Sequence, residues 1–520
     1  MVTDNVNGIM AFDYGTSTST AAIIKEGIIH YPLNAENGGL MSSAVYVEKD
    51  KITCVCTLDV KPKKGAVLLQ NTKRLLGKHK RDFNDSMLNG VDYGAEVQSD
   101  ERERLYFNCN IGNKENPEYC KVYPEEVFYV LLKYVKEECE KRAQCEMTFC
   151  CLTIPHYTTD NARFLMRQQL TKLGLQCSFM IKEPTAAGIP YLLPDPNTSN
   201  TVVNEGDNVL VFDFGGGTLD ITIIHRSGDC YTVIGSGGDP TLGGVTIDAA
   251  ISEYVLKEYE KQGIDLLGKS KKMIPKRGMK LRTLCRVAKE VLSANENHEI
   301  DLSDFVKETE LVFNLTTVLF EDIMKPIIEK CKATYRKVLQ TSKIDGRSID
   351  HRNIDHVLLV GGSSRIPCIK NIFKDKHIIN DVNYNPQQAV VCGAITAAKH
   401  NIVANNLEEI MESTIGVMVY DKRKNKFTPH IKEGTSLPTT TFSSYILTPK
   451  ENEYDLVVYR DVGGGKYHQE GYIKLTNLLR EGEIKVEINV YLEVTVDGAL
   501  KYTVKDSQGI ELGKENIFLC

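Results

Sequence analysis

The chain has 520 residues, including 63 basic and 69 acidic ones, and its formal net charge is −6. At about 150 residues per domain, this length predicts two to four domains with cores of their own. Hydrophobic residues make up 42% and charged residues 25%, which is typical of globular proteins and excludes wholesale disorder. No long run of Lys or Arg marks a surface for nucleic acid or an anionic membrane, and no stretch approaches the roughly 18 apolar residues of a membrane span.

The amino terminus, MVTDNVNGIMAFDYG, has no basic segment followed by an apolar one and leads directly into an expected β-strand. A secretory signal is therefore not expected, and we predict a cytoplasmic protein. Fifteen cysteines are scattered along the chain without a C-x-x-C pair. In a reducing compartment this pattern predicts small, mostly buried thiols, and it favours neither disulfides nor a metal site.

The first expected element is a hairpin over residues 8–24, GIMAFDYGTSTSTAAII. An apolar strand is followed by Asp13, an aromatic residue, a tight turn and a second strand. The turn carries a glycine and two hydroxyl groups, at Gly15, Thr16 and Ser17. The same plan returns at residues 208–224, NVLVFDFGGGTLDITII, where Asp213 stands 200 positions after Asp13. This spacing predicts two similar lobes that face each other across a cleft.

The second turn is formed by three consecutive glycines, Gly215, Gly216 and Gly217. We expect them to adopt positive φ and to direct backbone N–H groups toward an anion, with the hydroxyl of Thr218 beside them. One carboxylate behind each turn suits a hydrated Mg²⁺ ion, because that ion keeps several waters and takes few protein ligands. A single glycine-rich hairpin is more often only a turn, but the matched pair predicts a site for a nucleoside triphosphate.

A second phosphate-loop pattern occurs at residues 263–270, where GIDLLGKS matches G-x-x-x-x-G-K-[ST]. A true loop of this kind follows a buried strand and opens a helix. Here an amphipathic helix is expected before the pattern, and KKMIPKRG with Pro275 follows it. We therefore interpret this match as coincidental.

A third glycine site lies at residues 356–373, HVLLVGGSSRIPCIKNIF, which predict a strand, a turn at Gly361 and Gly362, and a helix. Such a turn suits a sugar or a ring laid against the backbone, and Arg365 can stack its guanidinium group on a base. Taken alone, the turn fits a purely structural connection equally well.

The periodicity of the chain changes near residue 400. Before it, short apolar strands alternate with helical stretches, which predicts α/β architecture for residues 1–400. Residues 401–413 are polar and acidic and are expected to form a linker or a frayed helix end. From residue 414 to 520 the apolar period is two, with an Asp497-Gly498 turn between apolar strands, so an antiparallel β domain is expected.

With these three sites in order, the chain resembles the superfamily of actin, sugar kinases and heat-shock chaperone ATPases, and especially the seventy-kilodalton heat-shock chaperones. Further matching stretches are NTKRLLG at 71–77, TIPHYTTDNAR at 153–163, IKEPTAAGI at 181–189, DPTLGG at 239–244 and LRTLCRVAKEVLS at 281–293. The resemblance covers residues 8 to about 400. It implies an actin-like two-lobed ATPase domain, followed by a small antiparallel β-sandwich that binds peptide.

The resemblance also implies roles for matching residues. Asp13 and Asp213 correspond to carboxylates that hold Mg²⁺ through water, and Lys73 to the lysine that places the attacking water. Glu183 corresponds to the glutamate that polarises the site, and Thr218 to the threonine beside the γ-phosphate. Without the resemblance, Lys73 would be interpreted as a solvated surface lysine and Glu183 as a carboxylate at a helix start.

The nucleoside pocket matches the family only in part. The agreeing positions are Lys289, Ser293, Gly361, Gly362, Ser363 and Arg365. Arg286 and Glu290 exchange the signs of the Glu and Arg that flank the nucleoside in the family, and Gln387 replaces an acidic residue. We therefore expect a shifted and weaker affinity for nucleotides.

The carboxy-terminal part resembles the peptide-binding sandwich more loosely, through IKEGTSLP at 431–438 and the hairpin at 486–504. The sequence stops at Cys520, so the helical lid of the family is expected to be missing. The linker carries Glu408, Glu409 and Glu412 where the family is apolar, and these acids are expected to disfavour docking into an apolar groove. The loop expected to arch over bound peptide is the charged DKRKNK at 421–426.

The sequence therefore predicts a chaperone or co-chaperone that binds ATP, ADP and Mg²⁺ and hydrolyses ATP slowly. Its expected partners are unfolded or nascent polypeptide and possible co-chaperones or a partner chaperone, with no nucleic acid and no membrane. Two alternatives stay open. One is a non-hydrolysing scaffold stabilised by ATP, and the other is a small-molecule kinase on the same fold.

Overall fold

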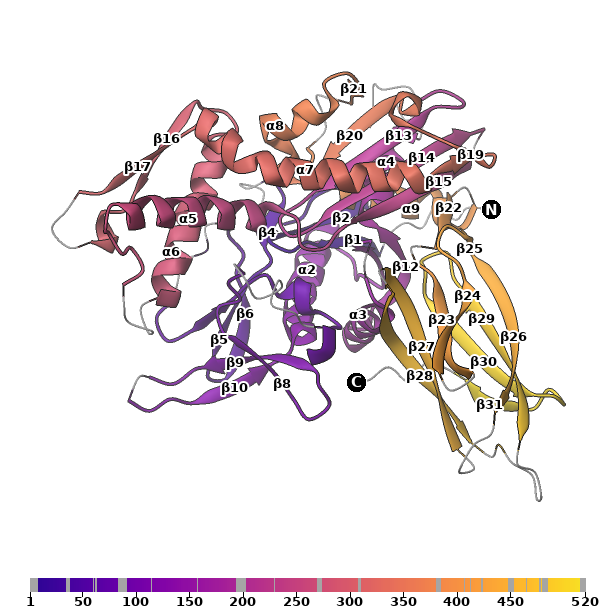
Figure 1. Ribbon diagram of the computed structural model, residues 1–520. Coiled ribbons are helices and arrows are strands. Elements are labelled where there is room, and N and C mark those ends of the chain that lie inside the picture. Colours follow the sequence, from indigo (N-terminus) through magenta and orange to yellow (C-terminus); the bar gives the residue numbers. More distant parts are fainter. Residues whose placement is uncertain are drawn as a thin grey trace.

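The structure is a computed structural model. It describes residues 8–33, 38–58, 60, 63–82, 91–113, 115–156, 158–192, 203–228, 230–268, 274–306, 310–379, 385–405, 407–411, 413–421, 424–447, 453–463, 465–476, 478 and 485–514. Two α/β lobes lie beside a β-sandwich that is coloured orange to yellow in Figure 1. Across these described residues, no helix has the length and apolar character needed to cross a membrane.

The first lobe is built on a mixed sheet with the expected hairpin in it. The strand order is β12 (Gln176–Lys182), β11 (Phe149–Ile154), β1 (Ile9–Tyr14), β2 (Thr18–Lys25) and β3 (Ile28–His30), with β4 (Leu40–Ser42) also paired to β2. Helices α2 (Pro124–Ala143) and α3 (Asp160–Lys172) accompany this sheet. The apolar residues of α2, including Phe128, Leu131 and Val135, recur at helical spacing and are buried in the core of this lobe.

Two small sheets and two short 3₁₀ helices extend the first lobe. The strands are β5 (Val45–Glu48), β6 (Lys51–Cys54) and β7 (Val67–Leu69) in one sheet, and β8 (Glu96–Ser99), β9 (Leu105–Asn110) and β10 (Tyr119–Val122) in the other. The 3₁₀ helices are η2 (Thr72–Leu75) and η3 (Lys80–Asp82).

The second lobe repeats the plan on a larger sheet. Its strand order is β21 (His377–Ile378), β20 (His356–Val360), β13 (Asn208–Phe214), β14 (Leu219–Ser227), β15 (Cys230–Asp239), β22 (Leu407–Ile410) and β25 (Ser436–Leu437). Every residue of β13 is buried, which explains its unbroken apolar sequence, because helices cover both faces of this sheet. The hairpins β1–β2 and β13–β14 have equivalent registers, with Asp13 opposite Thr20 and Asp213 opposite Asp220.

The helices of the second lobe differ in their surroundings. Helices α4 (Glu183–Leu192) and α9 (Ala389–His400) pack closely between the two lobes, where a Cβ on Gly393 would lie 1.6 Å from the Ala186 carbonyl oxygen. The other helices and small strands are α5 (Gly244–Lys261), α6 (Ile274–Val291), β16 (Asn297–Asp301), η4 (Ser303–Phe305), β17 (Val312–Thr316), α7 (Thr317–Thr341), β18 (Lys343–Ile344), β19 (Arg347–Ser348), η5 (His351–Asn353), η6 (Gly362–Arg365), α8 (Pro367–Lys370), η7 (Asn371–Phe373) and α10 (Ile402–Asn405).

The carboxy-terminal part is a sandwich of two four-stranded antiparallel sheets. One sheet has the order β24 (Lys424–Ile431), β23 (Ile415–Asp421), β27 (Glu453–Gly463) and β28 (Lys466–Thr476), and the other β26 (Thr439–Leu447), β29 (Val486–Val494), β30 (Leu500–Asp506) and β31 (Glu511–Lys514). Buried and exposed residues alternate along β29, as the period-two pattern of the sequence predicts. Lys422 and Arg423 of the charged loop lie outside the described residues.

Strand β22 of the acidic linker docks onto the second lobe, so the expectation that the acids disfavour docking is wrong for Glu408 and Glu409, and Glu412 lies outside the described residues. Strand β22 pairs in parallel with β15. Glu409 is buried there because Lys182 Nζ donates to its Oε2 at 3.0 Å and Thr185 Oγ1 donates to its Oε1 at 2.7 Å. The strand pairing satisfies the backbone and the buried lysine neutralises the acid, which replaces the apolar contact expected from the family.

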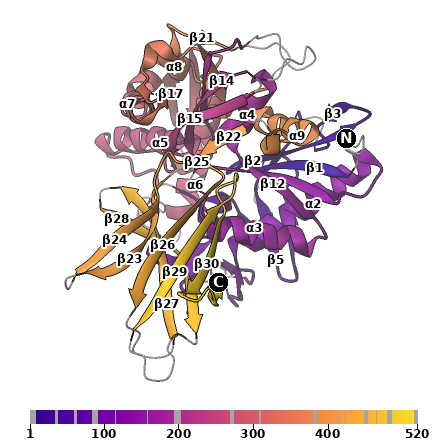
Figure 2. The same cartoon turned by 90° about the vertical axis from the view of Figure 1, so that its right-hand side faces the viewer.

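The sandwich also packs against the first lobe, and we call this contact the domain interface. It joins η3 and α3 to β28 and the β29–β30 turn, and Figure 1 shows β28 beside α3. Figure 2 views the sandwich from its other side, in front of the two lobes. The backbone N–H of Asp160 donates to Glu470 Oε2 at 3.2 Å, and His468 Nε2 lies 2.8 Å from Asp82 Oδ1. Arg163 is 1% exposed and donates from Nη1 to the Gly498 carbonyl at 3.4 Å.

Candidate functional site

The two hairpin turns meet where the lobes face each other, and we call this region the lobe junction. A Cβ on Gly216 would lie 2.5 Å from Ser17 Oγ, and one on Gly217 would lie 2.6 Å from Thr16 Oγ1. The glycines are therefore required by the close approach of the turns. The expectation of positive φ at Gly215, Gly216 and Gly217 is wrong, because none of the three has one.

Some backbone groups of the glycine turn form hydrogen bonds within the protein, and others face the lobe junction without a protein partner among the described residues. The Gly215 carbonyl accepts from Gly244 N at 3.0 Å and from Ser363 Oγ at 2.9 Å. Within the described part of the chain, the N–H groups of Gly216 and Gly217 have no acceptor. These N–H groups are therefore available to an anion bound at the turns.

Three aspartates gather behind the turns. The pKa of Asp13 is raised to about 7 by burial and by the charge of Glu183, against the effects of Lys73 and of the 2.7 Å hydrogen bond from Thr153 Oγ1. The pKa of Asp213 is raised well above its usual value by burial and by the same neighbouring carboxylates. Asp220 is fully buried, and burial and Glu183 raise its pKa to about 7. The junction thus holds more negative charge than the described protein around it neutralises.

One lysine faces these carboxylates. Lys73 Nζ lies 2.5 Å from Glu183 Oε1, and both side chains are about nine-tenths buried. Burial opposes the charge of Lys73, but Glu183 and Asp13 outweigh it, so its pKa is raised. Lys73 is held there because η2 is tied to β1 by the 2.9 Å contact between Tyr14 Oη and Thr72 Oγ1. Glu183 is the first residue of α4, directly after β12.

The third glycine site reaches the same junction. Gly361 has φ of 80°, and a Cβ there would lie 2.8 Å from Asp213 Oδ1. Lys289 is buried and pairs with Asp248 at 2.7 Å, while a Cβ on Gly244 would lie 3.1 Å from its Nζ.

Other residues expected in the nucleoside pocket are less engaged. Arg365 is exposed, and Ser293 Oγ, just after α6, donates to the Lys289 carbonyl in that helix at 3.3 Å. A Cβ on Gly362 would lie 3.7 Å from Gln387 Nε2. The Nε of Arg286 is buried without a partner in the described part of the chain, and Glu290 is exposed. Among the described residues, Arg286 and Glu290 therefore form no ion pair in the pocket.

Three further residues at the junction escaped the sequence analysis. Asp220 occupies the position that Thr20 has in the first hairpin, so the duplication itself hid this carboxylate. His156 donates its backbone N–H to Asp220 Oδ1 at 3.0 Å. Arg74 Nη2 reaches the Gly217 carbonyl at 3.5 Å across the lobes. Its position next to Lys73 in NTKRLLG was the available signal for Arg74.

The second phosphate-loop pattern follows a helix and not a strand. Helix α5 ends at Lys261, directly before the pattern begins at Gly263. Lys269 and Ser270 lie outside the described residues. The absence of a preceding strand agrees with its interpretation as a coincidental match.

The donor set of the junction fits a divalent cation. Asp220 Oδ2 is buried and has no hydrogen-bond partner within the described residues. Burial, and after it the charge of neighbouring carboxylates, raises the pKa values of Asp13 and Asp213. No three His, Cys, Asp or Glu side chains of the described residues are placed to hold an ion directly. Carboxylates that act through ordered water suit Mg²⁺.

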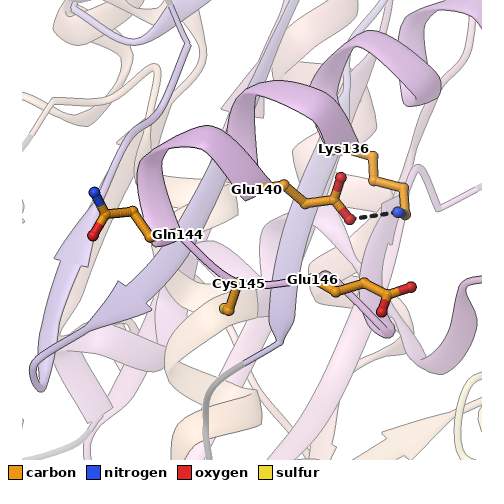
Figure 3. Close-up of a pocket in the computed structure, with 5 residues that line it drawn as sticks. All are labelled: Lys136, Glu140, Gln144, Cys145 and Glu146. Atoms are coloured by element: carbon orange, nitrogen blue, oxygen red, sulfur yellow. Dashed lines mark hydrogen bonds and ion pairs between the residues drawn. The ribbon is translucent and has the colours of Figure 1, made fainter.

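A separate pocket of about 450 Å³ lies at the end of α2 (Figure 3). It is lined by Lys136, Glu140, Gln144, Cys145 and Glu146. Lys136 and Glu140 pair with each other across it at 2.5 Å. None of these residues belongs to the lobe junction, and we assign the pocket no role.

Comparisons with known proteins agree with this arrangement. The sequence model of the Hsp70 protein family matches residues 9–512. A heat shock cognate HSP70 protein of Trypanosoma brucei brucei is 28% identical over 531 aligned residues, which cover 96% of this chain and 74% of that protein. The two lobes with an appended β-sandwich define an actin-like ATPase fold. The chain belongs to the Hsp70 family, whose members are ATPases, and is a chaperone of the seventy-kilodalton heat-shock type.

Proposed function

We propose that this chaperone binds Mg²⁺ with ATP or ADP at the lobe junction and hydrolyses ATP slowly. The observation that carries the proposal is the contact of the two turns, with Gly216 and Gly217 against Ser17 and Thr16. Donor groups on both sides of one point suit a polyphosphate, and the buried carboxylates behind them suit its magnesium ion. When bound, that ion neutralises charge on the phosphates.

The proposed roles follow from these positions. Asp13 and Asp213, together with Asp220, would hold the ion through water, and Thr218 would contact the terminal phosphate. Lys73 would neutralise charge that develops on that phosphate and position a water, with Glu183 orienting the lysine. Phosphoryl transfer to water depends on positioning and fixed positive charge, which this arrangement supplies.

We further propose that the sandwich binds extended segments of unfolded or nascent polypeptide weakly, and that the chain acts with co-chaperones or a partner chaperone. Its sandwich and its docked linker support this reading. A cytoplasmic location remains part of the proposal.

The test is single-turnover ATP hydrolysis by purified protein. We expect Lys73→Ala to slow hydrolysis by about 100- to 1,000-fold, the usual loss when one preorganised charge-stabilising group is removed. ATP affinity, measured by calorimetric titration with and without Mg²⁺, should stay close to that of the wild type. Lys80→Ala is the control, because Lys80 is exposed nearby and contacts none of the carboxylates.

Each rival function has its own outcome. Tight ATP binding by the wild type without hydrolysis would favour the non-hydrolysing scaffold. Transfer of phosphate to a sugar or polyol in a panel of such compounds would favour the kinase. Unchanged hydrolysis in Lys73→Ala would reject the role assigned to Lys73.

A further inference from the structure

Two cysteines lie close together where β6 ends. Cys54 is the last residue of this strand, and Cys56 follows after one residue. The buried Val55 between them is held in place because its N–H donates to the Ala44 carbonyl at 3.0 Å. Both cysteine side chains are partly exposed. The segment therefore presents a pair of thiols that small solutes can reach.

The two thiols interact with each other and with a tyrosine. The side chains of Cys54 and Cys56 are hydrogen-bonded to each other. Helix α2 lies against β6 (Figure 1), and from this helix the Tyr134 hydroxyl donates to the sulfur of Cys56. In its neutral form Cys56 also donates to the Cys54 carbonyl at 3.8 Å. This contact is long and a thiol is a weak donor, so it does little to hold the proton on Cys56.

These contacts make the two sulfur atoms chemically different. The hydrogen bond from Cys54 lowers the pKa of Cys56 to about 6, and the one from Tyr134 acts in the same direction, against burial and the charge of Glu138. Glu138 is itself paired with Lys141, whose Nζ donates to its Oε1 at 2.6 Å. The pKa of Cys54 is raised, because the same hydrogen bond and burial favour its neutral form. Cys56 is therefore the nucleophile of the pair, and Cys54 is a neutral thiol beside it.

We propose that hydrogen peroxide oxidises this pair reversibly to a disulfide, with Cys56 as the nucleophile and Cys54 as the resolving thiol. The Cys56 thiolate attacks one peroxide oxygen, so that an S–O bond forms, the O–O bond breaks and the leaving hydroxide takes up a proton to become water. Cys54 then loses its proton and attacks the sulfur of Cys56, so that an S–S bond forms, the S–O bond breaks and a second water leaves. The two sulfur atoms together lose the two electrons that the peroxide gains.

The local geometry suits a reversible bridge. In an extended chain, Cα atoms two positions apart are separated by at most about 7 Å, which is close to the upper limit for a disulfide. A bridge at that limit is strained, and strained or exposed disulfides are easily reduced. Among the described residues, no group of three His, Cys, Asp or Glu side chains includes this pair, so oxidation suits it better than metal binding.

A second pair of cysteines in the same lobe serves as a matched control. Cys109 on β9 lies directly opposite Cys120 on β10, and their side chains are also hydrogen-bonded to each other. Burial raises the pKa of both thiols, that of Cys109 to about 12, and Cys109 is fully buried. Both pairs thus have neighbouring sulfur atoms, but the pairs differ in whether a thiolate forms and in whether solvent reaches it.

Peptide mapping by mass spectrometry, after treatment of the reduced full chain with hydrogen peroxide, tests the proposal. We expect the peptide that contains Cys54 and Cys56 to lose the masses of its thiol hydrogens at least about tenfold faster than Cys109 and Cys120 form a bridge, because the reaction needs a thiolate. Dithiothreitol should restore the reduced peptide. Equal rates of oxidation in the two pairs would overturn the proposal. This measurement uses the wild type alone, so it stands even where a variant fails to fold.

Two variants test the separate roles. Cys54→Ser should accumulate a sulfenic acid on Cys56 that dimedone traps, because the serine hydroxyl can still donate to the thiolate but cannot form a disulfide. Cys56→Ser should leave Cys54 largely unoxidised, and oxidation of Cys54 at the wild-type rate would contradict the choice of nucleophile. A sulfenic acid that persists on Cys56 in the wild type, without a bridge, would reject Cys54 as the resolving thiol. Thermal melting checks that each variant is folded.

Discussion

The molecule contains two networks of buried charge that are built in opposite ways. At the lobe junction, Asp13, Asp213 and Asp220 share one neighbouring lysine, Lys73, which already pairs with Glu183. At the domain interface, three acids of the described residues each lie beside a cation, although burial still raises the pKa of one of them, Asp160, to about 6. Glu470 pairs with Arg460, Asp82 with His468, and Asp160 with Arg163.

This difference distinguishes a network that receives a ligand from a network that supports the structure. A buried network with excess negative charge costs folding free energy until a cation enters, so the lobe junction is arranged to receive a ligand. A network whose charges are matched needs no ligand, and it holds the sandwich against the first lobe in a fixed orientation. Substitutions at the junction are therefore expected to change binding and catalysis, and those at the interface to change docking.

The largest change in free energy is expected for Arg163→Met, which should weaken docking of the sandwich onto the first lobe. Removing this arginine leaves Asp160 buried beside Glu470 without its main partner, which should weaken domain docking by about 3–5 kcal/mol. Arg167→Met is the matched control, because Arg167 pairs with Asp497 at the same interface but is 37% exposed, so about 1 kcal/mol or less is expected.

Cleavage by a glutamate-specific protease after Glu409, distinguished by mass spectrometry from cleavage after the exposed Glu408, measures docking in both variants, because the linker strand β22 also pairs with β25 next to the sandwich. Glu409 is buried when the linker is docked, so faster cleavage after it reports undocking. Equal cleavage rates for Arg163→Met and the wild type would show that the interface does not depend on this network.

The sequence predicted the parts of the molecule that local patterns carry. The paired hairpins, the α/β class, the antiparallel carboxy-terminal strands and the turn at Gly361 follow from strand periodicity and turn residues. Asp220 was missed because its partner in the duplication is Thr20, which carries no charge. The linker was misjudged because Glu409 is neutralised by Lys182, 227 positions away. Long-range pairs of this kind have no local signature in a single sequence.

An effect of intermediate size, on the free energy of unfolding, is expected for Asp220→Asn in the absence of nucleotide. The folded pKa of Asp220 is about 7, above the usual 3.8, so in the wild type this group costs stability increasingly as pH rises between these values. The variant should gain about 1–3 kcal/mol of unfolding free energy at neutral pH and much less near pH 4. Thermal melting across this pH range measures the gain, with Asp455→Asn as an exposed control.

The same variant should lose part of the stabilisation that MgATP gives, because one carboxylate of the ion's surroundings is gone. A variant that gains no stability without nucleotide would contradict the picture of unbalanced charge at the lobe junction. A gain that is the same at all pH values would show that packing, and not ionisation, is responsible.

The smallest effect is expected from the titration of His468. Burial opposes its charge, but the hydrogen bonds and charges of Asp82 and Glu470 prevail and raise its pKa from 6.5 to about 9. Because the folded pKa is raised, the contribution of His468 to docking is complete below pH 6.5 and is lost as pH rises toward about 9.

His468→Gln removes this dependence, so the ratio of linker cleavage in the variant to that in the wild type should be highest at low pH and should fall toward one as pH rises. Lys78, which also lies near Asp82 and Glu470, is present in both proteins, and its titration largely cancels in that ratio. A ratio that does not change with pH would show that protonation of His468 does not affect docking. The electrostatic contribution to docking would then come from the arginine pairs.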